Sequence, residues 1–264
     1  MVNRAIAGSV HRELATPAFV LRTRAFGESD RIVTLLTARH GKITGIAKGA
    51  KNSRRRFAGT LEPFVHIRAV FRQRPSSELV FLLRCEFLSA LRGFSRDLDC
   101  FAAGSYVLEL TDRLVFGRES GPDIYDLVHE ALTLLDAGAA TSPVLRTFEL
   151  HMLSATGYAP ALDRCRSCGA AASEALFLDA ERGGVACRRC VIAGRVVKPV
   201  APETMRILAR LAAARLDEAA AGPDSISVEV AAAAEHLIAA VVQGPLRTRE
   251  FMLRARVDSP GFVR

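Results

Sequence analysis

The chain has 264 residues, of which 50% are hydrophobic and 24% are charged, so it has room for two globular domains and a sizeable core. The first twenty residues contain Arg4, Arg12 and Glu13 and no apolar run of signal-peptide length, and no later stretch is long enough to span a membrane. We therefore expect a cytoplasmic protein, where cysteines are better suited to metal binding than to disulfides.

The net charge of +8 is unevenly distributed. Residues 1–74 hold 15 Lys and Arg against 4 Asp and Glu, a balance of +11, whereas residues 75–264 hold 21 against 24, a balance of −3. This asymmetry is typical of a nucleic-acid-binding module joined to a near-neutral scaffold. A basic solubilising surface is the alternative.

Residues 1–16 are predicted to form a leader of uncertain order. Residues 17–92 contain five β-rich runs, which are separated by turn residues: Ala18–Phe26, Arg31–Ala38, Lys42–Ala47, Leu61–Arg72 and Glu78–Ala90. Five short strands in about 75 residues predict a small closed or partly closed barrel.

Beyond Phe94 the apolar residues recur at helical spacing. We predict helices over 98–116, 121–135 and 142–156, with Ser142 as the N-cap of the third and Pro143 in its first helical position. Two further helices are predicted over 202–220 and 228–242, followed by a short element around Phe251. Residues 93–160 and 197–264 thus form two parts of one helical bundle, with a module inserted at 161–196.

The inserted module carries the most specific motif of the chain. Cys165, Cys168, Cys187 and Cys190 follow the pattern C-x2-C, eighteen residues, C-x2-C, which suits one tetrahedral zinc ion better than an iron–sulfur cluster. Two disulfides or four free thiols are the alternative. Four thiolates leave no open position for substrate, so the site is predicted to be structural and to stabilise the fold by on the order of 10 kcal/mol.

Several arginines flank these cysteines. We expect them to screen the negative thiolates, with contact to a nucleic acid as the alternative; they are Arg164, Arg166, Arg188 and Arg189.

A basic stretch in the N-terminal module is the candidate nucleic-acid contact. Six cations and no acidic residue lie between Lys42 and Arg56, and Gly45 and Gly49 keep the backbone open to close approach. Long cationic side chains neutralise phosphates, and Phe57, Phe64 or Phe71 would offer a stacking face for bases. Cations from other predicted strands add to the same module: Arg22, Arg24, Arg31, Arg68, Arg72 and Arg74. A solvated charged loop is the alternative.

No catalytic motif is visible. The sequence has no P-loop, nucleophile elbow, zinc-protease helix or carboxylate cluster, its histidines are scattered, and Cys85 and Cys100 lie in apolar runs typical of buried thiols. We therefore predict that the protein is not an enzyme. A zinc-stabilised nuclease or a ligase accessory domain is a weaker alternative.

The ordered motifs of the chain resemble those of a known family, the bacterial DNA repair and recombination mediator RecO. The resemblance spans nearly the whole chain and rests on dispersed segments: Val20–Arg22, Gly27–Thr37, Gly41-Lys42, Ala47–Lys51, Leu61–Pro63, Gly157–Pro160, Leu162-Asp163 and Leu246–Arg249 with Phe251.

This resemblance implies an α+β multidomain protein, in which an N-terminal OB-fold β-barrel precedes an α-helical bundle with an inserted four-cysteine zinc module. It also implies a nucleoid-associated protein that binds single- and double-stranded DNA, anneals complementary strands and acts with RecR to load RecA onto DNA coated by the single-strand-binding protein, SSB. The tail of SSB is expected to bind the helical domain. A protein-interaction scaffold with incidental DNA affinity is the alternative.

The residues expected to serve this function are of two kinds. One structural zinc ion is expected at the four cysteines. The expected DNA-binding residues are Arg22, Arg24, Arg31, Lys42, Lys48, Lys51, Arg54, Arg55, Arg56 and Phe57.

Overall fold

A computed structural model describes residues 13–73, 77–118, 122–171, 176–191, 197–223 and 225–258, except for the side chains of 253–258. The described residues fall into two compact units that divide between Ala90 and Leu91, with Gly117 and Arg118 belonging to the first unit. Within these ranges, no helix combines the length and the apolar character needed to cross a membrane.

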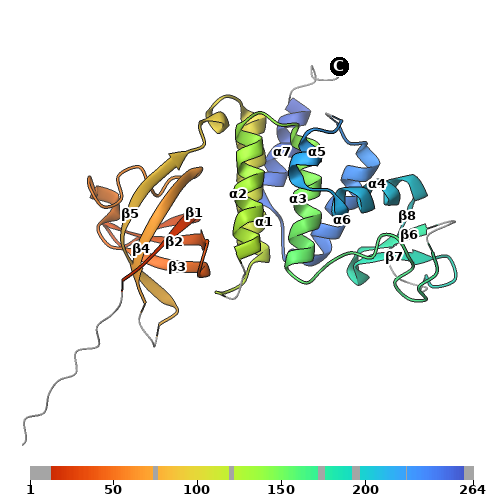
Figure 1. Cartoon of the computed structure of the whole chain (residues 1–264), viewed down its shortest axis with the longest axis horizontal. Helices are drawn as coiled ribbons and strands as arrows, with labels where there is room; N and C mark the ends of the chain where they lie inside the picture. The colour runs from red at the N-terminus through yellow and green to blue at the C-terminus, as the bar shows by residue number, and fades with distance from the viewer. Residues whose placement is uncertain are drawn as a thin grey trace, which may run out of the picture. The chain divides into compact units, whose positions relative to one another are not determined.

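The first unit is a closed five-stranded barrel (Figure 1). Its strands run around the barrel in the order β1-β2-β3-β5-β4; the β3–β5 pair is parallel and the other pairs are antiparallel. This is the Greek-key arrangement of an OB-fold, as predicted. The strands are β1 Glu13–Phe26, β2 Asp30–Thr37, β3 Gly41–Ala47, β4 Val65–Arg72 and β5 Leu79–Ala90.

Alternating side chains fill the barrel. In β3 every second residue is buried, and its inward positions join Val33, Leu35 and Phe71 in one apolar core. Gly45 permits the parallel pairing of β3 with β5, because a Cβ at this position would lie 2.9 Å from Cγ2 of Val80. Glycine at position 45 therefore lets β3 approach β5 closely enough to close the barrel.

Two strands differ from their predicted limits by more than one residue, and residues 13–16 of the predicted leader belong to β1. β1 begins at Glu13 because its first half pairs with β4, from Glu13 opposite Arg72 to Phe19 opposite His66. β4 begins at Val65 and not at Leu61, since Phe64 has a left-handed φ of 61° that interrupts the extended backbone.

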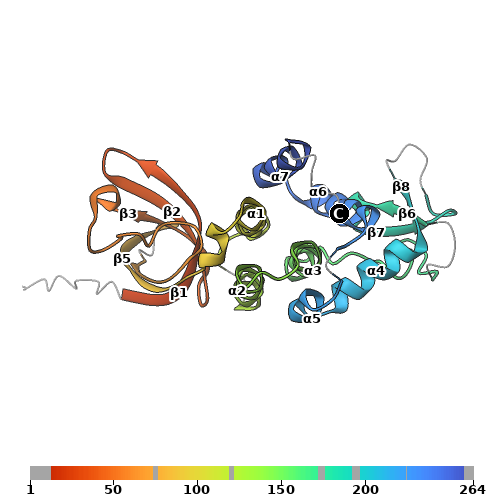
Figure 2. The same cartoon turned by 90° about the horizontal axis from the view of Figure 1, so that it is seen from above.

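The second unit is a helical bundle around α3 (Figure 2). Apolar residues at helical spacing bury α3 along most of its length, and it packs against α1, α2, α4, α5 and α6. A short 3-10 helix, Arg92–Ser95, precedes the bundle. The helices are α1 Leu98–Leu114, α2 Pro122–Asp136, α3 Thr141–Ala155, α4 Pro202–Ala213, α5 Leu216–Ala220, α6 Val228–Val241 and α7 Arg247–Asp258.

Helix ends account for two errors of prediction. The predicted N-cap Ser142 lies inside α3, which begins at Thr141 with Ala140 in the N-cap position. The single helix predicted over 202–220 is broken into α4 and α5, because the backbone is extended at Arg215, whose N–H donates to Glu218 and starts a new turn.

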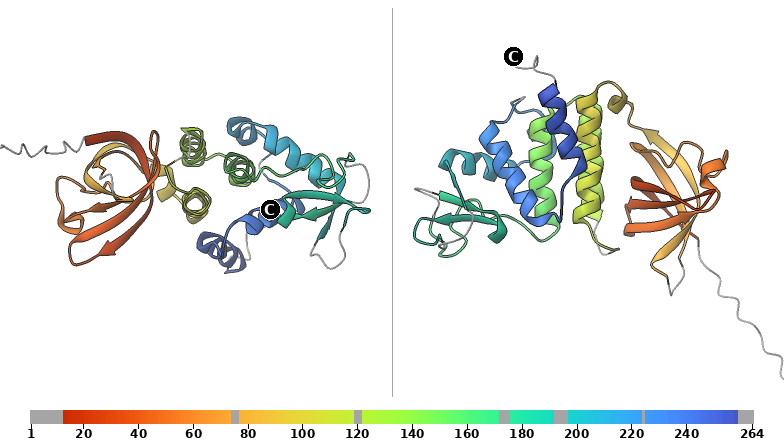
Figure 3. Two further views of the ribbon diagram at one scale, coloured as in Figure 1. Left: turned by 90° about the horizontal axis from the view of Figure 1, so that it is seen from below. Right: turned by 180° about the vertical axis from the view of Figure 1, so that it is seen from behind.

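A three-stranded sheet is inserted between α3 and α4 (Figure 3). β6 Leu176–Asp179 lies between β7 Gly184–Cys187 and β8 Lys198–Val200. Gly184 lets the segment before the first cysteine pair pass close to β7. A Cβ at this position would lie 2.5 Å from the carbonyl oxygen of Ala161. The insertion is joined to the bundle by the short helix Ala180–Arg182, which contacts α6.

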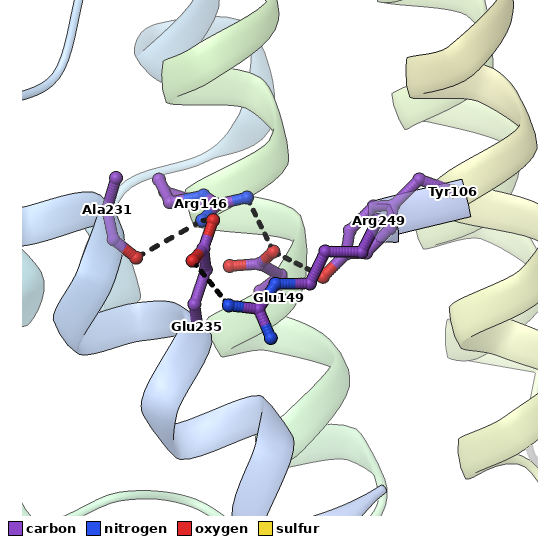
Figure 4. Close-up of polar contacts among 6 residues, drawn as sticks. All are labelled: Tyr106, Arg146, Glu149, Ala231, Glu235 and Arg249. Atoms are coloured by element: carbon purple, nitrogen blue, oxygen red, sulfur yellow. Dashed lines mark hydrogen bonds and ion pairs between the residues drawn. The ribbon is translucent and has the colours of Figure 1, made fainter. Parts of the chain in front are cut away.

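A buried polar network joins the helices of the second unit (Figure 4). Arg146 of α3 pairs with Glu149 at 2.7 Å, and the Tyr106 hydroxyl of α1 donates to the same carboxylate oxygen at 2.5 Å. Glu235 of α6 lies 3.4 Å from Arg146 and accepts from Arg249 of α7 at 2.8 Å. One tyrosine and four charged side chains thus connect α1, α3, α6 and α7.

Besides the contact of Arg249 with Glu235, helix α7 is held by Glu109 of α1. Its carboxylate accepts from the backbone N–H groups of Arg247 and Thr248, at 3.0 and 2.9 Å, and from the Thr248 hydroxyl at 2.5 Å. These N–H groups at a helix N-terminus have no partner within their own helix. A carboxylate from another helix therefore acts as the cap of α7.

Candidate nucleic-acid interface and metal centre

The four predicted metal ligands converge at one point of the inserted sheet. The Sγ atoms of Cys165, Cys168, Cys187 and Cys190 all lie within 4.8 Å of one another, and those of Cys168 and Cys187 are 3.8 Å apart. A tetrahedron with zinc–sulfur bonds of about 2.3 Å has sulfur atoms about 3.8 Å apart. None of these four cysteines is paired in a disulfide, and the convergence of all four sulfur atoms on one point is the arrangement that a single metal ion needs.

Two tight turns present these thiols. Gly169 donates its N–H to the carbonyl of Cys165 at 2.8 Å, and Cys190 donates to the carbonyl of Cys187 at 2.9 Å. The first turn is also joined to β7, because the N–H of Arg166 donates to the carbonyl of Val185 at 2.9 Å. The geometry of the cluster is therefore set by the backbone.

The electrostatics of the cluster fit a divalent cation. Burial works to raise the pKa of Cys165, but hydrogen bonds from the backbone at Cys187, Cys168 and Ser167 outweigh it and lower this pKa to about 6. Hydrogen bonds to Cys168 and Cys187 raise the pKa of Cys190 to about 12. The cluster thus favours the thiolate form at Cys165 and the protonated form at Cys190, and ionisation of all four thiols needs a positive ion to offset the accumulated charge.

Two of the arginines around the cluster have partners within the module. Arg164 pairs with Asp163 at 3.1 Å, and Arg182 donates to the hydroxyl of Ser167 at 3.0 Å. Arg166, Arg188 and Arg189 are exposed on the same loops.

The basic loop after β3 is attached to the turn that joins β1 and β2. Gly49 donates its N–H to Oδ1 of Asp30 at 2.8 Å, and Lys51 donates its N–H to the carbonyl of Ser29 at 2.9 Å. The ammonium of Lys51 also donates to the carbonyl of Gly27 at 2.8 Å. Residues 24–31 and 48–56 therefore lie together at one end of the barrel, called the basic rim below, which carries seven cations against the two carboxylates of Glu28 and Asp30.

The predicted cations differ in their surroundings. Arg31 pairs with Glu62 at 3.4 Å, and Arg56 donates to the carbonyl of Lys48 at 2.7 Å, so both help to hold the rim. Four others are exposed and make no ion pair with any residue that the structure describes; they are Arg24, Lys48, Arg54 and Arg55. Arg22 is exposed on β1.

Lys42 lies apart from this rim. It is at the opposite end of β3 from Lys48, about 20 Å along the strand. There it lines a hollow of about 800 Å³ with Thr44, Glu78 and Arg118. Burial lowers the pKa of nearby His40, and the charges of Arg118 and Arg39 lower it further.

The predicted stacking residues must be corrected. Phe57, Phe64 and Phe71 are 3%, 8% and 1% exposed, and Phe57 and Phe71 belong to the barrel core. A buried ring has no face to offer a base, so Phe57 is removed from the contact residues. Its position next to five charged or polar residues suggested exposure, but the chain turns inward there, with Arg56 bonded to Cys85 of β5 through the backbone.

Phe26 is an exposed aromatic residue that was not among the predicted contacts. It ends β1, immediately before the turn that holds the basic loop, and it is 50% exposed. It alternates with Arg22 and Arg24 along the strand.

Comparisons with known proteins agree on one family. Residues 12–91 match the family described as Recombination protein O N terminal, and residues 95–250 match Recombination protein O C terminal. Similar relatives include the DNA repair protein RecO of Anaeromyxobacter sp. (strain K), 41% identical over 77% of this chain and 81% of the relative. The protein of the same name from Geobacter metallireducens is 35% identical over 92% of this chain and 98% of the relative. The chain therefore belongs to the RecO family of DNA repair proteins.

Proposed function

We propose that this protein is a non-enzymatic recombination mediator that binds single- and double-stranded DNA through its barrel and anneals complementary strands. The observation that carries the proposal is the basic rim, where Lys48, Arg54 and Arg55 are exposed on a loop held by hydrogen bonds to the β1–β2 turn. Two DNA strands repel each other through their phosphates, so neutralising both backbones promotes annealing without nucleotide hydrolysis.

The proposal includes the predicted partners. RecR and the tail of SSB would be recruited, the latter by the helical unit, so that RecA is loaded onto SSB-coated DNA in the cytoplasm, at the nucleoid. The metal centre would hold one zinc ion. Because four thiolates would complete its coordination, this ion would stabilise the fold and take no part in chemistry.

The electrostatic part is tested by measuring affinity for a single-stranded oligonucleotide across a salt series. With roughly four phosphate contacts, the logarithm of affinity should fall with a slope of about −3 against the logarithm of salt concentration. Replacing Arg54 and Arg55 with Ala should make this slope less steep by about 1.4. The matched control replaces Arg206 and Arg210, two exposed cations of α4, and should leave the slope unchanged.

Strand annealing by the purified chain, with and without SSB, tests the activity itself. Annealing that depends on Arg54 and Arg55 would support the proposal. A flat salt response, or recruitment of SSB without annealing, would favour a protein-interaction scaffold with incidental DNA affinity.

A further inference from the structure

We propose that Phe26 is the base-stacking residue of the barrel and that, with Arg24 and Arg22, it forms a track for single-stranded nucleic acid on the outer face of β1. This inference rests on the proposed function and deepens it, because it identifies a contact to the bases in addition to those with phosphates.

The barrel register places these three side chains on one face. Arg22, Arg24 and Phe26 are paired with Thr34, Ile32 and Asp30 of β2, and residues two apart on a strand point to the same side. The intervening Thr23 pairs with Val33, which lies in the barrel core. Arg22, Arg24 and Phe26 therefore point outward, at intervals of about 7 Å.

Phe26 adjoins the turn to which the basic loop is bonded. It immediately precedes Gly27, whose carbonyl accepts from the Lys51 ammonium at 2.8 Å. It is also paired with Asp30, whose carboxylate accepts from the N–H of Gly49 at 2.8 Å. Phe26 and the basic loop therefore meet at one end of the barrel.

Exposure distinguishes Phe26 from the aromatic residues nearby. Phe57, Phe64 and Phe71 are at most 8% exposed, whereas Phe26 is 50% exposed. An aromatic face next to cations is the combination by which proteins hold single strands without sequence preference, since every base has a face that can stack. Phe87 of β5 is 58% exposed and provides a matched control, because it lies on a strand outside this face.

The absence of tryptophan from the sequence permits a direct test. In the Phe26→Trp variant of the full chain, the single tryptophan reports on its own contacts. The variant is titrated with oligo(dT) and with an abasic oligonucleotide of equal length, while the anisotropy of labelled DNA monitors saturation. We expect oligo(dT) to quench the emission of Phe26→Trp and the abasic strand to leave it nearly unchanged. The emission of Phe87→Trp should not change with either strand.

A second variant measures the energetic contribution. Phe26→Ala should weaken binding of oligo(dT) by about fivefold or more, leave binding of the abasic strand within about twofold, and keep the salt slope of the unmodified protein. The proposal is overturned if Phe26→Trp is not quenched at saturation, is quenched equally by the abasic strand, or behaves like Phe87→Trp. If the stacking proposal fails in one of these ways but the affinity still depends steeply on salt, the proposed DNA binding through phosphates stands. A flat salt response would refute the proposed function as well.

Discussion

Arg146 and Glu149 form a 2.7 Å ion pair in which the carboxylate is fully buried and only 8% of the arginine side chain is exposed. Burial raises the pKa of Glu149, while the charge of Arg146 and the hydroxyl of Tyr106 act in the opposite direction. The charge of each partner is therefore tolerated because the other is present.

Arg146→Met should lower the free energy of unfolding by about 3–5 kcal/mol, because it leaves the carboxylate without its cation. The double variant Arg146→Met/Glu149→Leu should lose less than the single variant, since neither charge then remains in the core. Urea unfolding followed by circular dichroism measures both. Arg206→Met, which breaks an exposed 2.8 Å pair with Glu203, is the control and should cost less than about 1 kcal/mol. Equal effects of Arg146→Met and Arg206→Met would contradict a buried pair.

Cys165→Ser should reduce bound metal and thermal stability together, because the cluster then lacks one of its four thiolates. Elemental analysis of purified protein should give about one zinc ion per chain before the substitution, and much less after it. Cys100→Ser is the control, since this thiol instead contacts the carbonyl of Leu135 in the bundle. A Cys165→Ser protein that stays folded and keeps its zinc, yet no longer binds DNA, would refute a structural role.

Metal affinity should fall as the pH is lowered, and more steeply below about pH 6. Metal binding displaces protons from thiols, so affinity decreases when more protons must be displaced. Above pH 6 the Cys165 thiol is already largely ionised, whereas below it this thiol carries a proton too. Competition with a zinc chelator between pH 5 and 8 measures the slope. A constant slope through this range would contradict a preformed Cys165 thiolate.

Glu109→Ala should loosen α7 and leave the rest of the helical unit folded. The substitution removes three hydrogen bonds from one carboxylate and a negative charge at a helix N-terminus, which together should cost about 2–3 kcal/mol. Amide hydrogen exchange in α7 should become faster than in the unmodified protein, whereas exchange in α3 should stay close to its original rate. Asp126→Ala, at an exposed position of α2, should change neither rate. Unaltered exchange in Glu109→Ala would show that α7 is held by other contacts.

The barrel and the metal centre could be predicted because their signals are local. A β-rich run alternates within a few residues, and two C-x2-C pairs specify a site by their spacing alone. The order β1-β2-β3-β5-β4 fits the predicted OB-fold, and Gly45 leaves the space that the parallel pairing of β3 with β5 needs.

Burial of individual side chains was harder to predict. Phe57 follows three arginines, and nothing nearby in sequence shows that the backbone of Arg56 bonds to Cys85 and turns the ring inward. The pair of Arg146 and Glu149 looks like an ordinary surface pair one helical turn apart until the other helices surround it. Such features depend on contacts between distant segments.

The cap of α7 has a consequence for synthesis of the protein. Glu109 and Thr248 are separated by 139 residues, and the whole metal module lies between them. During translation Glu109 is made long before the backbone N–H groups that donate to it, so the helical unit is completed only after the whole metal module has been synthesised. A chain that terminates early, before Leu246, would keep its basic rim and its four cysteines but would leave Glu109 without these partners. Incomplete translation products would therefore differ from the finished protein in the closure of the bundle, and not in the surface proposed to bind DNA.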